Sequence, residues 1–166
     1  HCPSSKWRTC CVSLATDMGV RAARGKMVRG RQKARKCAMQ ALYQWQIQDQ
    51  PIKDVYNQFL SGEQEEGLDI EYFKELVLGA AEQRADLDLR IAEFADRHPS
   101  LLDPVEHAVL WIGFYELVNK IDVPFRVVLN EAVELARSFG AEDGHKYVNA
   151  VMDRAATELR AIEHQG

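Results

Sequence analysis

The stretch Val105–Val118, VEHAVLWIGFYELV, is the most hydrophobic segment of the sequence, and it decides the fold class. It is apolar at every position except Glu106, His107 and Glu116. A helix that is apolar on nearly all sides must be surrounded by other elements. Pro104 directly precedes the stretch, and proline is tolerated in the first turn of a helix. The sequence therefore predicts a central, buried helix that begins near Pro104.

Helical periodicity continues on both sides of this segment. The apolar residues that predict an amphipathic helix over about residues 31–48 recur with a period near 3.6 and are Ala34, Ala38, Ala41, Leu42 and Trp45. Similar patterns predict a short helix after Pro51, a helix from Ile70 whose apolar stripe continues after a bend or break to His98, one from Pro124 to Gly140, and a last one over roughly residues 142–162. No useful period-2 run occurs. We expect an all-α fold of about seven helices with short links.

The composition is that of an ordinary soluble globular protein, with 166 residues, 46% of them hydrophobic and 28% charged. This length suits one domain that buries its own core. No apolar run reaches the roughly 20 residues of a membrane span, and no secretory signal is recognisable. The four cysteines (Cys2, Cys10, Cys11 and Cys37) form no CxxC pair, so neither a disulfide framework nor a zinc site is expected. We expect a cytoplasmic protein with no metal and no other cofactor.

The charge is distributed unevenly along the chain. Residues 1–36 hold ten Lys/Arg and one acid, a net of +9, whereas residues 37–166 hold eleven Lys/Arg and twenty-four acids, a net of −13. A basic arm on an acidic body suggests that the arm binds a polyanion. Within Met27–Gln46, the cations are Arg29, Arg31, Lys33, Arg35 and Lys36.

These cations can contact phosphates, and the helix that follows offers groups for nucleic-acid bases. Gln40, Tyr43 and Gln44 supply amide and aromatic side chains, which suit hydrogen bonding and stacking with single-stranded RNA. The alternative is a solvated basic helix start with Tyr43 half in the core. Cations at a helix N-terminus oppose the macrodipole, which mildly favours a role beyond stability.

Residues 1–26 show no helical or strand period and carry three of the four cysteines. We interpret residues 1–28 as a disordered basic extension and residues 29–163 as the helical domain. The extension is expected to precede the natural start, at Met27 or Met18. A genuine disordered basic tail is the alternative.

The stretch Ser138–Met152, SFGAEDGHKYVNAVM, gathers ionisable residues in a way that suggests a site. A metal is disfavoured because His145 has no second histidine nearby and asparagine is a poor zinc ligand. No catalytic motif accompanies the stretch. An ordinary helix boundary explains part of it: Gly140 would take the left-handed conformation, and Glu142 and Asp143 would lie in the first turn. Lys146 and Tyr147 stay unexplained by that account.

Three segments in their order resemble the NusB family of bacterial antitermination factors: ARKCAMQALYQW (34–45), VEHAVLWIGFYEL (105–117) and DVPFRVVLNEAVELARSFGAEDGHKYVNAVMD (122–153). The resemblance covers about residues 29–160. It implies two perpendicular three-helix subdomains plus one additional helix, and a non-enzymatic adaptor. It also implies binding of single-stranded boxA RNA of ribosomal RNA leaders together with a small-subunit ribosomal protein (NusE), so that RNA polymerase in its antitermination complex reads through terminators.

The resemblance also implies roles for individual residues. The expected RNA-binding residues are Arg29, Arg31, Lys33, Arg35, Gln40, Tyr43, Asp143, Lys146 and Tyr147. Glu106 is expected to bind the ribosomal protein. Three positions depart from the family pattern: Gln32 interrupts an arginine run, Tyr147 stands where phenylalanine is common, and Ala150 replaces a frequent glycine. We expect the first turn of the last helix to lie beside Gln40 and Tyr43.

Two alternatives belong to other functional classes. The RNA-binding module of an rRNA cytosine methyltransferase is disfavoured, because the sequence carries no glycine-rich nucleotide-binding loop and no catalytic cysteine in a strand–turn context. The second is a self-associating bundle, in which a homodimer without RNA covers the RNA-binding surface.

Overall fold

The computed structural model describes residues 8–164, with side-chain environments from residue 20 to residue 163. The helices in chain order are α1 (Arg8–Gln48), α2 (Ile52–Ser61), α3 (Ile70–Glu82), α4 (Arg84–Phe94), the short 3₁₀ helix η2 (Pro99–Leu101), α5 (Pro104–Asn119), α6 (Phe125–Phe139), α7 (Gly144–Leu159) and α8 (Ala161–His164). The described part of the chain contains no strand. The predicted all-α class is therefore confirmed.

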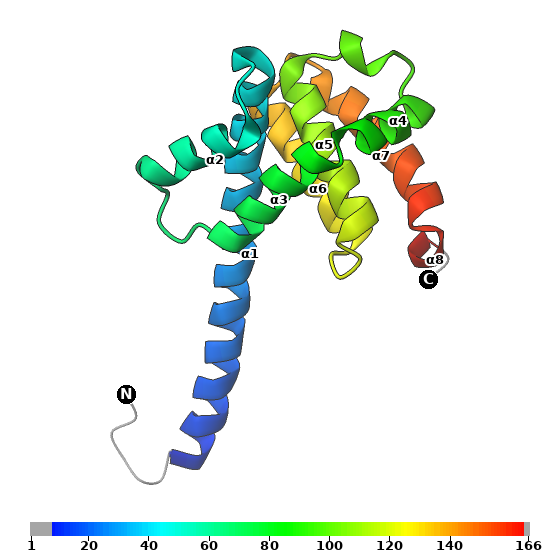
Figure 1. Ribbon diagram of the computed structural model, residues 1–166. Coiled ribbons are helices and arrows are strands. Elements are labelled where there is room, and N and C mark those ends of the chain that lie inside the picture. The colour runs from blue at the N-terminus through cyan, green and yellow to red at the C-terminus, as the bar shows by residue number, and fades with distance from the viewer. Residues whose placement is uncertain (1–7, 165–166) are drawn as a thin grey trace.

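Helix α5 occupies the centre of the molecule (Figure 1). Every residue from Glu106 to Leu117 is buried. The helix begins at Pro104, as predicted, and Asp103 caps it because its carboxylate accepts hydrogen bonds from the backbone N–H groups of Val105 and Glu106. Helices α1, α3, α4, α6 and α7 all contact α5. The hydrophobic segment that decides the fold class is thus the helix around which the others pack.

The helices form two groups of three, with α4 as the additional helix. Helices α1, α2 and α3 contact one another, and so do α5, α6 and α7. Contacts of α1 and α3 with α5 join the two groups, and α4 packs against α5 and α7. The grouping into two three-helix subdomains plus one helix agrees with the predicted architecture.

Helix α1 is longer than the sequence analysis indicated. It begins at Arg8 instead of near residue 31, and its N-terminal half projects from the body in Figure 1. No proline interrupts residues 8–48, and Ala, Arg and Lys, which favour helices, are frequent there. Helix α1 therefore includes residues 8–28, which were expected to lie in a disordered extension, and the assignment of residues 1–28 as an extension stays a prediction. Residues 1–7 lie outside the described residues, and the domain boundary at residue 29 stays a prediction.

A buried ion pair fastens α1 to the centre. Arg35 and Glu116 are 3% and 1% exposed. The Arg35 Nε donates to Glu116 Oε1 at 2.9 Å, and its Nη2 donates to Oε2 at 2.9 Å. Tyr72 of α3 donates its hydroxyl to the same Oε2 at 2.6 Å. The Glu116 carboxylate of α5 thus fixes the positions of both α1 and α3. Separating either charge of the pair from the other would leave it buried and unpaired, which costs free energy.

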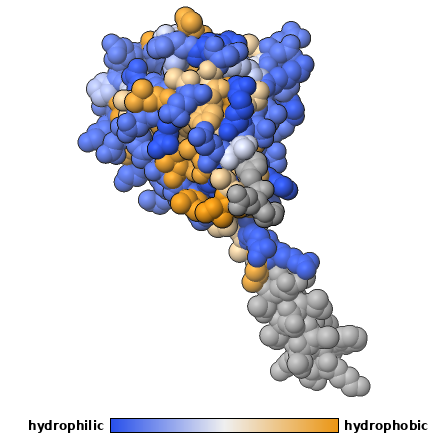
Figure 2. Space-filling view, turned by 90° about the vertical axis from the view of Figure 1, so that its right-hand side faces the viewer, coloured by the Kyte–Doolittle hydropathy of each residue, from blue (hydrophilic) through white to orange (hydrophobic). Residues whose placement is uncertain are grey.

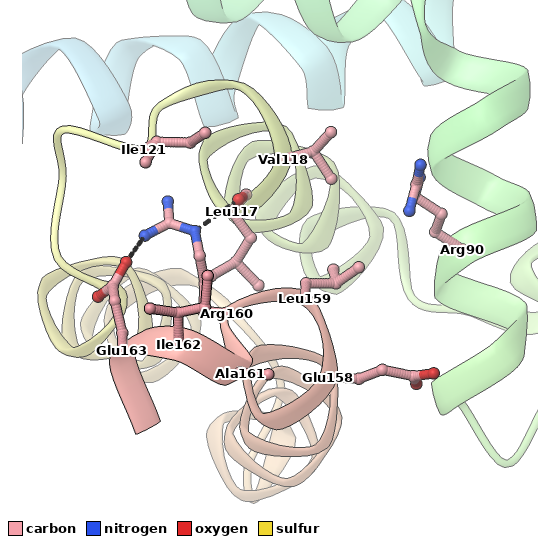
Figure 3. Close-up of a pocket in the computed structure, with 10 residues that line it drawn as sticks. All are labelled: Arg90, Leu117, Val118, Ile121, Glu158, Leu159, Arg160, Ala161, Ile162 and Glu163. Atoms are coloured by element: carbon pink, nitrogen blue, oxygen red, sulfur yellow. Dashed lines mark hydrogen bonds and ion pairs between the residues drawn. The ribbon is translucent and has the colours of Figure 1, made fainter. Parts of the chain in front are cut away.

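At the same C-terminal end of α5, Arg160 performs a similar task. Its guanidinium donates to the backbone carbonyls of Leu117, Glu116, Lys120 and Val123. Figure 3 shows it between Leu117 and Glu163, and Glu163 accepts a hydrogen bond from the backbone N–H of Phe125 at 3.0 Å. The end of α7 therefore closes the C-terminus of α5 and the start of α6, whose free backbone groups need partners.

An apolar cavity of about 520 Å³ lies beside this clamp, between α4, the end of α5 and the α7–α8 junction. Figure 2 shows apolar residues gathered on this face of the molecule. The most exposed apolar side chains of these elements and the α5–α6 loop are Leu89, Ile121 and Ile162.

Candidate nucleic-acid interface

One face of α1 carries most of the residues expected to contact RNA. Arg29, Lys33, Lys36, Gln40, Tyr43 and Ile47 follow one another at intervals of three or four residues, which places them along one side of a helix. All six are exposed or half-buried. We call these six residues the α1 stripe. It is basic in its first half and ends in an amide, a phenol ring and an aliphatic side chain.

Arg35 lies on the other side of α1 and faces the core. Its Nε and Nη2 both donate to the Glu116 carboxylate, as described above. The phosphate contact expected of Arg35 is therefore corrected to a structural role. The physical reason is helical phase, since Arg35 stands among the core positions Ala34 and Ala38.

Arg31 is half-buried on the same inner side. Its guanidinium carbon lies 4.6 Å from the centroid of the Tyr72 ring, and its Nη1 lies 3.8 Å from Asp122 Oδ2. The side chain is 26% exposed, so only part of its charge faces solvent. Arg31 can therefore reach a phosphate only at the edge of the surface.

A groove of about 550 Å³ lies at the C-terminal half of the α1 stripe. Gln40, Tyr43, Gln44 and Ile47 line one side, and the other residues that line it are Met39, Gln48, Phe59, Val105 and Phe139. Tyr43 and Phe139 are each 40% exposed. The groove thus presents two accessible aromatic rings and three amides, the groups that stack on bases and hydrogen-bond to their edges.

The residues before α7 differ from the prediction in two details. Gly140 is extended, with φ −83° and ψ 177°, and the left-handed residue is Asp143, with φ 65°. Gly140 is required for space, because a Cβ there would lie 2.6 Å from the carbonyl oxygen of Ala136. Glu142 and Asp143 precede the helix, which begins at Gly144, so the expected first-turn position of these acids is corrected.

The first turn of α7 presents an exposed ion pair and a ring. Lys146 Nζ lies 3.0 Å from Asp143 Oδ1, and both side chains are mostly exposed. The Tyr147 ring is half-buried, and the Arg97 guanidinium carbon lies 4.4 Å from its centroid. Burial raises the pKa of the Tyr147 phenol above its usual value. Arg97 was not singled out from the sequence, and no local pattern around it indicates this contact.

Glu106 lies against the start of α7. It is 6% exposed, and a Cβ at Gly144 would overlap its Oε1. Glycine at this position therefore allows the carboxylate to approach the α7 backbone closely. Burial, and secondarily the charge of Asp103, raise the pKa of Glu106. Burying a carboxylate away from water costs free energy, so stability alone does not explain Glu106 at this position.

The two parts of the expected RNA surface are the end of the α1 stripe and the start of α7, and these contacts place both at one end of the molecule. Val105 and Phe139 line the groove beside Tyr43. Glu106 follows Val105 and touches Gly144, and Figure 1 shows the end of α1 and the start of α7 at the same end of the fold. The end of α1 and the start of α7 thus lie at the same end of the fold. The expected position of the first turn of α7 beside Gln40 and Tyr43, and the roles of these residues in RNA binding, stay predictions.

His107 serves the core. Its Nε2 lies 2.7 Å from Asp88 Oδ1, which also accepts a hydrogen bond from Trp111 Nε1 at 2.8 Å. Burial alone would raise the pKa of Asp88, but the hydrogen bonds from His107 and Trp111 hold it below its usual value. This network ties α4 to α5.

Neither a metal centre nor a membrane span was found in the described part of the chain. No group of three or more His, Cys, Asp or Glu side chains there is arranged to hold a metal ion. No described helix combines the length and the apolar character that crossing a membrane requires.

This fold and this surface correspond to the class of helical adaptor proteins that bind nucleic acid. Residues 32–157 match the NusB family, and the chain belongs to that family. The resemblance seen in the sequence is thereby confirmed. As a NusB antitermination factor, the protein is not an enzyme.

Relatives and solved structures agree with this assignment. The transcription antitermination protein NusB of Shewanella amazonensis is 48% identical over 124 residues, which are 75% of this chain and 92% of the relative. That of Pseudoalteromonas atlantica is 46% identical over 133 residues, 80% and 95% of the two chains.

Two solved structures share the fold. The structure of T. maritima NusB matches with a TM-score of 0.71 and 25% identity, over 82% of this chain and 97% of that one. A structure of the antitermination factors NusB and NusE in complex with dsRNA matches with a TM-score of 0.64 and 27% identity, over 80% and 98%.

Proposed function

We propose that this protein binds boxA RNA of ribosomal RNA leaders together with the small-subunit ribosomal protein NusE, in the cytoplasm. In this complex it helps RNA polymerase to read through terminators. The observation that carries the proposal is the α1 stripe, which leads from cations into a groove with exposed amide and aromatic side chains.

The stripe and the start of α7 supply complementary contributions to RNA binding. Arg29, Lys33 and Lys36 attract the phosphate backbone, with a salt-dependent affinity and little sequence preference. Gln40 and Tyr43 contact bases within the groove. Asp143, Lys146 and Tyr147 form the second wall, where Lys146 adds a cation and Asp143 an acceptor for base amino groups.

The ribosomal protein is proposed to dock at Glu106 and the adjoining start of α7. The related NusB protein is known in complex with NusE and RNA, which supports this partner for the present chain. Glu106 lies between the groove and Gly144, so a partner bound there would adjoin the RNA. Without RNA, a homodimer that covers the same surface is proposed, and sedimentation with and without RNA tests it.

Fluorescence anisotropy with a labelled boxA-like RNA tests the proposal at two salt concentrations, with and without the ribosomal protein. We expect binding that weakens with salt and tightens when the ribosomal protein is present. Absence of binding at low salt, alone and with the ribosomal protein, would contradict the proposal.

A further inference from the structure

We propose that Glu65, in the loop between α2 and α3, is a built-in competitor for the phosphate groups of RNA on the α1 stripe. The inference rests on the proposed function, because it concerns the affinity of the same surface. It adds a residue that lowers this affinity in the free protein.

Two of the three cations of the stripe share one carboxylate. Lys33 Nζ lies 3.8 Å from Glu65 Oε1, and Lys36 Nζ lies 3.8 Å from Glu65 Oε2. Lys33 also donates a hydrogen bond to the backbone carbonyl of Glu66. Glu65 therefore occupies the position that a phosphate would take between these two lysines.

The loop is held in this position by its own backbone. The N–H of Asp69 donates to the carbonyl of Gly30 at 3.2 Å, which anchors the end of the loop to α1. Gly67 has φ +81°, a conformation that glycine adopts without strain, and it turns the chain towards α3. A Cβ at Gly30 would lie 3.0 Å from the Gly67 carbonyl oxygen, so the two segments are closely apposed.

The pairs are weak enough to be exchanged for RNA. The side chains of Lys33, Lys36 and Glu65 are 30%, 44% and 43% exposed, and exposed ion pairs contribute little because water and salt screen them. An RNA strand can displace Glu65, but it then faces an unpaired carboxylate beside its own phosphates. The loop thus lowers the affinity for every polyanion, and contacts to bases in the groove compensate for this loss only with a suitable RNA.

Removing the charge of Glu65 tests the inference. We expect Glu65→Gln to tighten binding of a boxA-like RNA about three- to tenfold at low salt, because two weak ion pairs no longer compete. Glu63→Gln is the matched control. Glu63 is exposed in the same loop and makes no ion pair among the described residues, so the same change of charge there should have a smaller effect.

A double-mutant cycle shows whether the gain acts through the lysines. In a Lys33→Ala/Lys36→Ala background, Glu65→Gln should leave RNA affinity unchanged. Thermal unfolding of each variant verifies that the fold is retained. An unchanged affinity of Glu65→Gln, an equal gain with Glu63→Gln, or a gain that persists without the lysines would overturn the inference.

An unrelated RNA of equal length separates this inference from the proposed function. If the protein binds both RNAs equally, boxA recognition fails, whereas a gain of Glu65→Gln for the unrelated RNA still supports competition by the loop. If the boxA-like RNA is preferred but Glu65→Gln gives no gain for either RNA, only the competition fails.

Discussion

Single residues of α1 divide between core and surface according to helical phase. Lys33 and Lys36 lie on the outer stripe, and Arg35 lies between them in sequence but points inward to Glu116. The positions of Ala34, Ala38 and Leu42 already predicted the buried side of this helix, so the inward position of Arg35 could be predicted from the sequence. The identity of its partner could not, because Glu116 is 81 residues away.

The buried position of Arg35 predicts a change in stability. Arg35→Ala should lower the free energy of unfolding by about 3–5 kcal/mol, because it leaves the Glu116 carboxylate buried without its cation. Urea denaturation measures this loss. Arg29→Ala, on the exposed stripe, should change stability by less than about 0.5 kcal/mol. A stable Arg35→Ala variant with weakened RNA binding would instead support the phosphate contact expected from the sequence.

Tyr43 is the residue for which we expect the largest base contact. Tyr43→Ala should weaken binding of a boxA-like RNA by about 1–3 kcal/mol, the usual contribution of one stacked base. Tyr43→Phe keeps the ring and should bind nearly as well as the original protein. Anisotropy titrations compare the three proteins. If Tyr43→Phe is as weak as Tyr43→Ala, the hydroxyl and not the stacking ring makes the contact.

Glu106 predicts a dependence of stability on pH. Burial raises its folded-state pKa above the ordinary glutamate value near 4.5, so folding disfavours the ionised form. Relative to Glu106→Gln, the original protein is therefore most stable below pH 4.5. Its free energy of unfolding decreases as the pH rises towards the folded-state pKa of Glu106. Glu106→Gln should be more stable at neutral pH, although it weakens binding of the ribosomal protein.

Thermal unfolding of both proteins at pH 4 and pH 7 measures this difference. A Glu106→Gln variant that is less stable than the original protein at pH 7 would show that the ionised carboxylate is stabilising where it lies.

At the scale of the elements, periodicity predicted the type of each helix better than its limits. The central helix was located correctly, because its apolar run begins directly after Pro104. The start of α1 was missed, since residues 8–30 carry no apolar stripe that reports burial. The separation of α3 from α4 at Gln83 was expected only as a bend or break, and no glycine or proline marks it.

The junction of α5 with α7 depends on one glycine. Gly144→Ala should displace the Glu106 carboxylate, because the added Cβ would overlap its Oε1. We expect weaker binding of the ribosomal protein, measured by calorimetry, and a lower melting temperature. Ala141→Gly, three residues earlier and exposed, is the control. Unchanged partner affinity in Gly144→Ala would show that the position of Glu106 does not matter for docking.

At the scale of the whole molecule, the fold brings residues from distant parts of the sequence to one surface. Groups that are close in sequence, such as Gln40 with Tyr43 or Asp143 with Lys146, follow from local spacing. Contacts between helices, such as Glu65 with the lysines or Arg97 with Tyr147, depend on tertiary packing and leave no local pattern. The resemblance to the NusB family supplied only the expectation that the first turn of the last helix lies beside Gln40 and Tyr43, and periodicity alone could not supply even that.

The central claim is that the α1 stripe and the start of α7 form one surface that recognises boxA RNA. The most direct measurement is the affinity for a boxA-like RNA relative to an unrelated RNA of equal length, with the ribosomal protein present. We predict a preference of about tenfold or more for the boxA-like RNA, which corresponds to about 1.4 kcal/mol. That preference should fall when Tyr43 or Tyr147 is replaced by alanine. Equal affinity for the two RNAs would contradict the claim.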